Sequence, residues 1–445
     1  MAELARRLRR VDALAIALGC VIGVGVFRNT GLALSGTGGF AAATLLWLVV
    51  GALCLGGAIL YADLSSRVPE AGGPYAYVRV AFGGRWAFVY GWLLAGVAIP
   101  ARSASTASVA SEFLAAWIPL PARALAVVLL VALALLHLLG VRAGAYAQHV
   151  LTTGKLATLA LVIGLSIALG LGGAPAGRGT PAAIPFADAL GAVWFTYLGW
   201  QDAVLLAEEL RAPRRDLPVV LVGTVALTMV LFVALHAVVY WGLGGGAEAY
   251  GRLPALTVAQ RTLGSLGDVV MRALMLSSMI GVTAVGLLVR PRIAMALARD
   301  GLGPAPLARV SRVGTPYAAL GLQTAIAVVL AATGRYETLL TLISFATGVL
   351  GLFETASYFV VRRKRPALPT SPGHPWAPLA FIVVSAALCA IGGVHRPMGI
   401  LTSAAILAAI ALVYAVARPR AIPAESSPQV AMHAAPVTPH PDAET

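Results

Sequence analysis

Charged residues are scarce in this sequence of 445 residues. They make up 11% of it, whereas hydrophobic residues make up 59% and the mean hydropathy is +0.87. Soluble domains carry about 25% charged residues, so the composition excludes an ordinary soluble protein and indicates an integral membrane protein. The polar stretches between the apolar runs are short, which excludes a soluble domain of useful size.

Cysteine is also rare, and the histidines show no metal-binding pattern. Cys20, Cys54 and Cys389 each lie alone in an apolar run, which favours small buried side chains over disulfides or metal ligands. The seven histidines are scattered without ligand spacing. A membrane-embedded enzyme would need a motif such as H-E-x-x-H or paired intramembrane aspartates, and neither occurs. We therefore expect no enzyme activity, no metal and no cofactor.

Positive charge exceeds negative charge, with a formal net charge of +14 at pH 7 and a pI of about 10.3. If the N-terminus is cytoplasmic, 22 of the 32 lysines and arginines fall in inner segments and seven in outer segments. This asymmetry follows the positive-inside rule and predicts that both termini are cytoplasmic. We expect a multi-pass protein of the cell membrane, with a bacterial inner membrane favoured. The charge is a topology signal and does not indicate nucleic-acid binding.

Long apolar runs dominate the rest of the chain. A spanning helix needs about 20 mostly apolar residues. On this basis we predict an all-α protein with twelve transmembrane helices, near residues 11–34, 39–66, 86–116, 122–140, 148–172, 186–208, 217–243, 267–298, 316–333, 338–361, 376–394 and 397–417. Residues 419–445 are rich in Pro, Ala and Ser without an apolar period, so we expect a disordered cytoplasmic tail.

The first apolar run contains "GCVIGVGVF" at residues 19–27, with Gly19, Gly23 and Gly25 in seven positions. Glycine weakens a helix, and a freed backbone group has no water to pair with in lipid. One explanation is that the glycines allow close helix packing. The other is that the helix breaks to form a binding site.

A second run has a similar weak point. Residues 193–210 read "VWFTYLGWQDAVLLAEEL", with Gly199 inside a polar and aromatic centre. The two weak points fall in predicted helices 1 and 6. Interrupted helices at matching positions of two halves are typical of inverted-repeat transporters, whose site lies between the breaks. We therefore expect residues 1–173 to form the first repeat, 174–366 the second, and 367–418 two further helices.

Two broken helices offer complementary chemistry for a zwitterion. The half-helix after a break presents free N–H groups and a positive dipole end, which suit a carboxylate. The half-helix before it presents free carbonyl groups, which suit an ammonium group. An amino acid backbone carries both charges, so the breaks predict an amino acid site.

Five motifs in this order resemble the amino acid–polyamine–organocation (APC) superfamily, and most closely its bacterial amino acid permeases and the L-type exchangers. They are "GCVIGVGVFRNTG", "SRVPEAGGPYAYVRVAFG", "FTYLGW" with "AEELRAPRRDLP", "RIAMALARDGLGP" and "RRKRP". They are spread over about 350 residues of the chain. The resemblance implies the LeuT-type fold, with a five-plus-five inverted repeat and broken helices 1 and 6.

The resemblance also implies roles for residues at the two breaks. Backbone amides in the first break would hold the substrate carboxylate, and backbone carbonyls in both breaks would hold its amino group. The aromatic ring at Phe195 would close over the substrate as a gate, unless it only fills the core. The residues carried over are Val21, Gly23, Val24, Gly25, Phe195, Leu198 and Gly199.

Two departures from the family pattern bear on the substrate. Val24 stands where many members have Ser or Thr, and Leu198 where others often have Asp, Gly or Ile. An apolar residue at 198 disfavours a pocket for a cationic side chain. We expect neutral, mainly apolar, amino acids. A permease for amines or polyamines is the alternative within the fold, and Asp202 is the acidic residue of the breaks that such a function could use. A channel is less consistent with paired breaks.

Lys155 lies in helix 5, where a charge costs several kcal/mol unless it is paired, neutralised or able to reach the surface. Its motif "GKLATL" resembles the lysine that replaces the second sodium ion in sodium-independent members. It would bridge the first break and helix 8, where Ser277 and Ser278 are candidate partners. A lysine that loses its proton during transport would give proton coupling, whereas a permanently charged one would fit exchange.

Other ionisable residues also lie in or beside the apolar runs. Arg102 either faces a polar cavity or pairs with Asp202 or Glu112, and Glu354 in helix 10 has no assigned role. An ion-pair network is expected where Glu208 and Glu209 precede "RAPRRD". Further expectations are an inner gate held by Arg299 and Asp300, and helix caps or interfacial polar groups at Asp12 and Asp63.

The expected partners follow from these interpretations. They are a small amino acid substrate, a proton or a counter-substrate amino acid, and the lipid bilayer. No cysteine is placed for a disulfide to an ancillary chain, so we expect no obligatory partner subunit.

Overall fold

The computed structural model describes residues 6, 8–115, 117–168, 184–251, 253–334, 336–366, 374–395, 397–417 and 419. Helices make up the described chain, and a single β-bridge joins Leu8 to Leu210. The predicted disordered tail and the side chain of Cys389 lie outside the described residues. The all-α class expected from the apolar runs is thus observed.

Most consecutive helices are joined by short connections. The first half contains α1 (Arg10–Val21), α2 (Gly25–Thr37), α3 (Phe40–Arg67), α4 (Pro74–Phe82), α5 (Gly84–Leu93), the π-helical η1 (Leu94–Ala98), α6 (Ile99–Leu114), α7 (Ala122–Leu138) and α8 (Val141–Ala168). The rest contains α9 (Phe186–Tyr197), η2 (Trp200–Leu206), α10 (Pro213–Gly242), η3 (Ala247–Tyr250), α11 (Pro254–Leu263), α12 (Ser265–Val289), α13 (Pro291–Arg299), η4 (Ala305–Ala308), α14 (Tyr317–Thr333), α15 (Tyr336–Lys364), α16 (Trp376–His395) and α17 (Pro397–Ala417).

Several of these helices can cross a membrane. Among the described residues, five helices are long and apolar enough, or six if the bent pair α1 and α2 is one span. Other apolar helices are shorter, and α7 and α14 have 17 residues each. By length and composition the structure therefore supports several spans, and the count of twelve stays a prediction.

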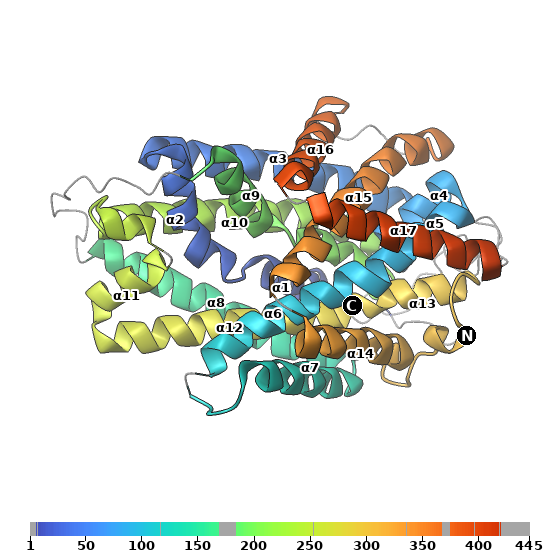
Figure 1. Cartoon of the computed structure of the whole chain (residues 1–445), viewed down its shortest axis with the longest axis horizontal. Coiled ribbons are helices and arrows are strands. Elements are labelled where there is room, and N and C mark those ends of the chain that lie inside the picture. The colour runs from blue at the N-terminus through green and yellow to red at the C-terminus, as the bar shows by residue number, and fades with distance from the viewer. Residues whose placement is uncertain are drawn as a thin grey trace, which may run out of the picture.

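Figure 1 shows the arrangement of the long helices. Helices α8, α10 and α12 run roughly along the longest axis, with α4 and α13 toward one end and α11 at the other (Figure 1). The sequence analysis had assigned no helix to α4 or α11, because both are short and lie in polar segments. Proline at the first helical position starts each of them.

The chain is interrupted at both glycine-rich positions. Helix α1 ends at Val21 and α2 begins at Gly25, with a bend of 48° between their axes. Helix α9 ends at Tyr197, Leu198 is extended, and the 3-10 helix η2 starts at Trp200. Helix α2 packs on α9, and α1 packs on η2. The packing brings the two interruptions together in the core.

Candidate functional site

The two interruptions are in direct contact at Gly199. Its φ of +126° is a conformation that residues with a Cβ rarely adopt. A Cβ built there would lie 2.8 Å from the carbonyl oxygen of Cys20. Glycine is therefore needed for both backbone conformation and close approach. This fits the expectation of a paired break better than helix packing alone.

Helices α2 and α9 are also joined by side-chain hydrogen bonds. The amide of Asn29 donates to the carbonyl of Ala192 at 3.0 Å and to the hydroxyl of Thr196 at 2.8 Å. A Cβ at Gly25 would lie 3.1 Å from the same hydroxyl, so the start of α2 sits tightly against α9. The sequence analysis did not single out Asn29 or Thr196. Their pairing over 167 positions leaves no local signal.

A cavity of about 660 Å³ lies beside the breaks. Its wall includes four predicted site residues: Val24, Gly25, Phe195 and Leu198. Phe195 exposes 47% of its surface and borders the cavity. Its role as a gate stays a prediction.

A smaller cavity of about 100 Å³ lies behind the first break. Val21 and Gly23 line it, together with residues shared with the main cavity. Gly199 lines neither cavity, and its contact is with Cys20. The predicted residues thus gather at one place, with Gly199 in a supporting position.

The backbone at the breaks has the polarity expected for a zwitterion. The first amides of α2, beginning at Gly25, have no partner within the helix by α-helical geometry. The carbonyl of Val21 accepts a bond from the amide of Gly23 at 2.8 Å, and that of Phe195 from the amide of Leu198 at 3.3 Å. Each carbonyl oxygen has a second lone pair for a ligand.

Lys155 is buried, with 1% of its surface exposed, and its ammonium group reaches the first break. It donates to the carbonyls of Gly19 at 3.3 Å, Ile22 at 3.2 Å and Ser278 at 3.2 Å. These three acceptors match the three protons of an ammonium group. Lys155 therefore ties the C-terminal end of α1 to α12.

The two candidate serine partners differ. The hydroxyl of Ser278 donates to the carbonyl of Ile22 at 2.7 Å, so Ser278 takes part in the same cluster. The hydroxyl of Ser277 donates to Leu274 in its own helix at 2.9 Å. A Cβ at Gly281 would lie 2.8 Å from the ammonium nitrogen of Lys155, so this glycine makes room for it.

Asp202 and Glu354 are two acidic residues of the cavity wall. Asp202 forms an ion pair with Arg290 at 2.7 Å and accepts a bond from the thiol of Cys20 at 3.5 Å. Glu354 accepts hydrogen bonds from Tyr61 and Tyr90. Glu354 thereby gains partners that the sequence could not name, because they lie more than 260 positions away. No group of three or more His, Cys, Asp or Glu residues within the described ranges could hold a metal ion.

Ion pairs are concentrated where the short helices α4 and α13 lie. Glu208 accepts from Arg299 at 2.9 Å, and Glu209 pairs with Arg292. The network expected at Glu208 and Glu209 is present, but α13 supplies these partners rather than the adjacent basic run 211–215. Of the acidic residues near that run, Asp216 pairs with Arg10 at 2.9 Å.

Asp300 belongs to this network as well. It accepts from Arg79 at 3.2 Å and from the hydroxyl of Tyr75 at 2.8 Å. Burial, and next the Asp300 carboxylate, raise the pKa of Tyr75 well above its ordinary value. Tyr75 therefore keeps its proton and remains a donor to Asp300.

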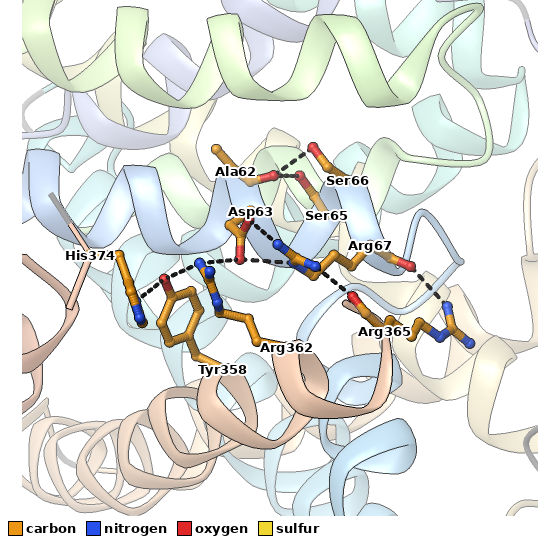
Figure 2. Close-up of polar contacts among 9 residues, drawn as sticks. All are labelled: Ala62, Asp63, Ser65, Ser66, Arg67, Tyr358, Arg362, Arg365 and His374. Carbon is orange, nitrogen blue, oxygen red and sulfur yellow. Dashed lines mark hydrogen bonds and ion pairs between the residues drawn. The ribbon is translucent and has the colours of Figure 1, made fainter. Parts of the chain in front are cut away.

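Asp63 lies four residues before the end of α3, and it does not cap the helix but joins α3 to α15 (Figure 2). It accepts from Arg67 at 3.0 Å and from Arg362 at 3.4 Å. The guanidinium group of Arg67 donates to the carbonyl of Arg365, and the guanidinium group of Arg365 donates to the carbonyl of Arg67 (Figure 2). Asp12, by contrast, does cap its helix, because its carboxylate accepts from the amide of Arg9 at 2.7 Å.

Comparison with known proteins agrees with this architecture. The chain is 28% identical over 420 residues to the methylthioribose transporter of Bacillus subtilis (strain 168), covering 87% of each chain. It is 23% identical over 385 residues to the serine/threonine exchanger SteT of the same organism, covering 84% of this chain and 88% of that one. It is 26% identical over 385 residues to the human large neutral amino acids transporter small subunit 2, covering 82% of this chain and 71% of the relative.

A solved structure supports the fold. Mhp1, a nucleobase-cation-symport-1 family transporter in a closed conformation with bromovinylhydantoin bound, aligns with a TM-score of 0.56 and 14% identity. The alignment covers 88% of this chain and 95% of Mhp1. The model of the amino acid permease family matches residues 8–418. The chain is therefore a multi-pass membrane transporter that belongs to the amino acid permease family of the APC superfamily.

Proposed function

We propose that this protein carries neutral amino acids across the cell membrane by alternating access. One observation carries the proposal: a cavity of about 660 Å³ adjoins two helix interruptions that touch each other. The amides of α2 would bind the substrate carboxylate, and the carbonyls of Val21, Phe195 and Leu198 its ammonium group. Phe195 would then cover the bound substrate.

We also propose the detailed LeuT-type architecture, with two inverted repeats and two further helices. Residues 1–173 and 174–366 would be the two inverted repeats, and 367–418 two further helices. Transport would follow from rocking one bundle against the other around the fixed site. We also infer that both termini are cytoplasmic, that the membrane is a bacterial inner membrane, that the chain needs no partner subunit, and that it catalyses no chemical reaction.

The preference for neutral over cationic substrates rests on the lining of the breaks. The acidic residue that an amine permease could use, Asp202, is paired with Arg290. Leu198 adds no charge to the cavity wall. An amine substrate would have to compete with Arg290 for the Asp202 carboxylate, and this supports an amino acid over an amine.

Lys155 is proposed to replace a sodium ion and to couple transport to protons or to exchange. Its ammonium group joins the C-terminal end of α1 to α12 through three carbonyl oxygens. Loss of its proton would weaken this joint and release α1. If Lys155 stays protonated, its three hydrogen bonds persist throughout the transport cycle. This behaviour would fit exchange of one amino acid for another.

The test is uptake by the purified protein in liposomes. The panel would contain labelled amino acids, putrescine and methylthioribose, each with and without an inward proton gradient. Gradient-driven uptake of neutral amino acids would support symport, and uptake driven only by internal amino acid would support exchange. Uptake of putrescine or methylthioribose alone, by folded protein, would overturn the amino acid assignment.

Lys155→Ala tests the coupling role in the same assay. We expect loss of gradient-driven uptake, because the variant lacks the three hydrogen bonds by which Lys155 connects α1 to α12. Lys364→Ala is the matched control, since Lys364 also donates to two backbone carbonyls, at 3.0 and 3.1 Å, but away from the break. Equal loss in both variants would mean that Lys155 only stabilises the fold.

A further inference from the structure

Arg102 is a partly exposed arginine in an apolar segment, and it makes no direct ion pair with the acidic residues Asp202 and Glu354 near it. It lies on α6, within the candidate span Gly84–Leu114. Within the part of the chain that the structure describes, its guanidinium group has no ion pair and no hydrogen bond. The partners considered for it from sequence are not available, because Asp202 is bound to Arg290 and Glu112 makes no ion pair with it. A charge inside a membrane is costly and is retained where it serves a function.

The position of Arg102 connects it to the substrate site. It lines both cavities, and it does so together with Val24, Gly25, Phe195 and Leu198. Arg102 thus stands on the wall that the two cavities share, at the level of both helix interruptions. A substrate bound at the breaks would lie within the same space.

A π-helical turn precedes Arg102, and such turns are frequent at functional sites. Residues Leu94–Ala98 form a π-helical turn, η1, directly ahead of α6. Leu94 and Ala98 line the main cavity on the same side as Arg102. A π-turn costs helix regularity and occurs mostly at functional sites, where it changes the direction of the side chains that follow.

The polar groups around Arg102 are already in use, which leaves it for a ligand. Glu354 accepts bonds from Tyr61 and Tyr90, and Asp202 from Arg290. A guanidinium group has five N–H donors and no acceptor, so its ligand must supply oxygen lone pairs. The carboxylate of an amino acid already has the free amides of α2. The remaining acceptor on such a substrate is in its side chain.

We propose that Arg102 is the specificity-determining residue of the site. It donates hydrogen bonds to an oxygen of the substrate side chain and repels a cationic one. The inference rests on the proposed function and narrows it to neutral amino acids whose side chain carries a hydroxyl or an amide oxygen. The proposal replaces the expectation of mainly apolar substrates, because Arg102 adds a charged donor to the same cavity wall as Leu198.

Threonine and valine form the sharpest test, since they differ by a hydroxyl in place of a methyl group. In liposomes, wild-type uptake of labelled threonine should be inhibited by unlabelled threonine at a concentration about tenfold lower than by valine, as expected for a hydrogen bond to a charged donor. In Arg102→Met, which keeps side-chain length without donors, this ratio should fall to about one. The same variant should admit lysine, which wild type excludes.

Two further variants make the result decisive. Arg102→Lys keeps the charge, so it should still exclude lysine while losing part of the threonine preference. Arg272→Gln is the control, because Arg272 pairs with Asp268 at 2.8 Å near the start of α12 and should leave the ratio unchanged. Thermal unfolding of each variant in detergent separates loss of folding from loss of selectivity.

The outcomes distinguish this inference from the proposed function. Equal weakening of threonine and valine in Arg102→Met would show that Arg102 holds the common backbone carboxylate, and it would overturn the specificity role. An unchanged ratio in a folded variant would overturn it as well. Failure of wild type to take up any amino acid would instead refute the proposed function itself.

Discussion

Gly199 adopts a φ of +126° where the second interruption passes closest to the first. The missing side chain lets the backbone of one half of the molecule rest on the carbonyl of Cys20 in the other. Gly281 acts in a similar way for Lys155, whose ammonium nitrogen would lie 2.8 Å from an added Cβ. Both close contacts of the site therefore depend on glycines, because a side chain at either position would collide with its neighbour.

Gly199→Ala should destabilise the protein and abolish uptake. The substitution forces a Cβ into an unfavourable conformation and 2.8 Å from the Cys20 carbonyl oxygen, at a cost of about 1–3 kcal/mol in the free energy of unfolding. Thermal unfolding in detergent and uptake in liposomes would measure both effects. Gly223→Ala on α10 is the control, since a Cβ there meets nothing within 4 Å. Equal stability of the two variants would contradict the structural role.

At the scale of elements, short contacts join helices that are distant in sequence. Asn29 ties α2 to α9, and Asp63 ties α3 to α15 (Figure 2). The Asp63 carboxylate is buried with Arg67, so it cannot be solvated if its partners are lost. Breaking a buried ion pair from one side leaves an uncompensated charge and is strongly destabilising.

Asp63→Asn should lower the free energy of unfolding by about 3–5 kcal/mol, because Arg67 is left buried without its carboxylate. Replacing Arg362 with glutamine should cost less, since Arg362 is more exposed and also bonds to Tyr358 at 3.0 Å. A double-mutant cycle between positions 63 and 362, followed by chemical unfolding, gives the coupling of α3 to α15. Additive effects would show that the 3.4 Å contact between them contributes nothing.

On the scale of the whole molecule, the ion-pair network lies at the end that contains α4 and α13 (Figure 1). Glu208 bonds to the amide of Ala71 at 3.1 Å and to Arg299 at 2.9 Å, so it joins the segment before α4 to α13. In the proposed topology these segments are cytoplasmic. We therefore predict that the network helps to close the cavity toward that side.

Glu208→Gln should shift the protein toward a conformation open to the cytoplasm. The amide keeps the bond to Ala71 but loses the charge that holds Arg299, so closure is weakened. Labelling of a cysteine introduced by Leu205→Cys, on the cavity wall, should be faster from the cytoplasmic side in this background. Labelling from the outer side should slow in parallel. Unchanged rates on both sides would show that Glu208 only supports the fold.

The sequence alone determined the class of the protein, because hydropathy and charge asymmetry are properties of local composition. It also located Gly25 and Gly199, where α2 begins and where α9 gives way to η2, since glycine in an apolar run is a local signal. The position of Lys155 in its motif pointed to the first break, and its contacts with Gly19 and Ile22 agree. Family membership followed from ordered motifs.

Only the tertiary structure decided which charged groups are paired and which are left for a ligand. Glu208 and Arg299 are 91 positions apart, and Asp202 and Arg290 are 88 apart, so neither pair has a signature in the sequence. The open question of Arg102 was decided in the same way, when Asp202 was found bound to another arginine. Such pairings depend on how helices pack and which side chains meet across them, and a one-dimensional pattern does not contain that information.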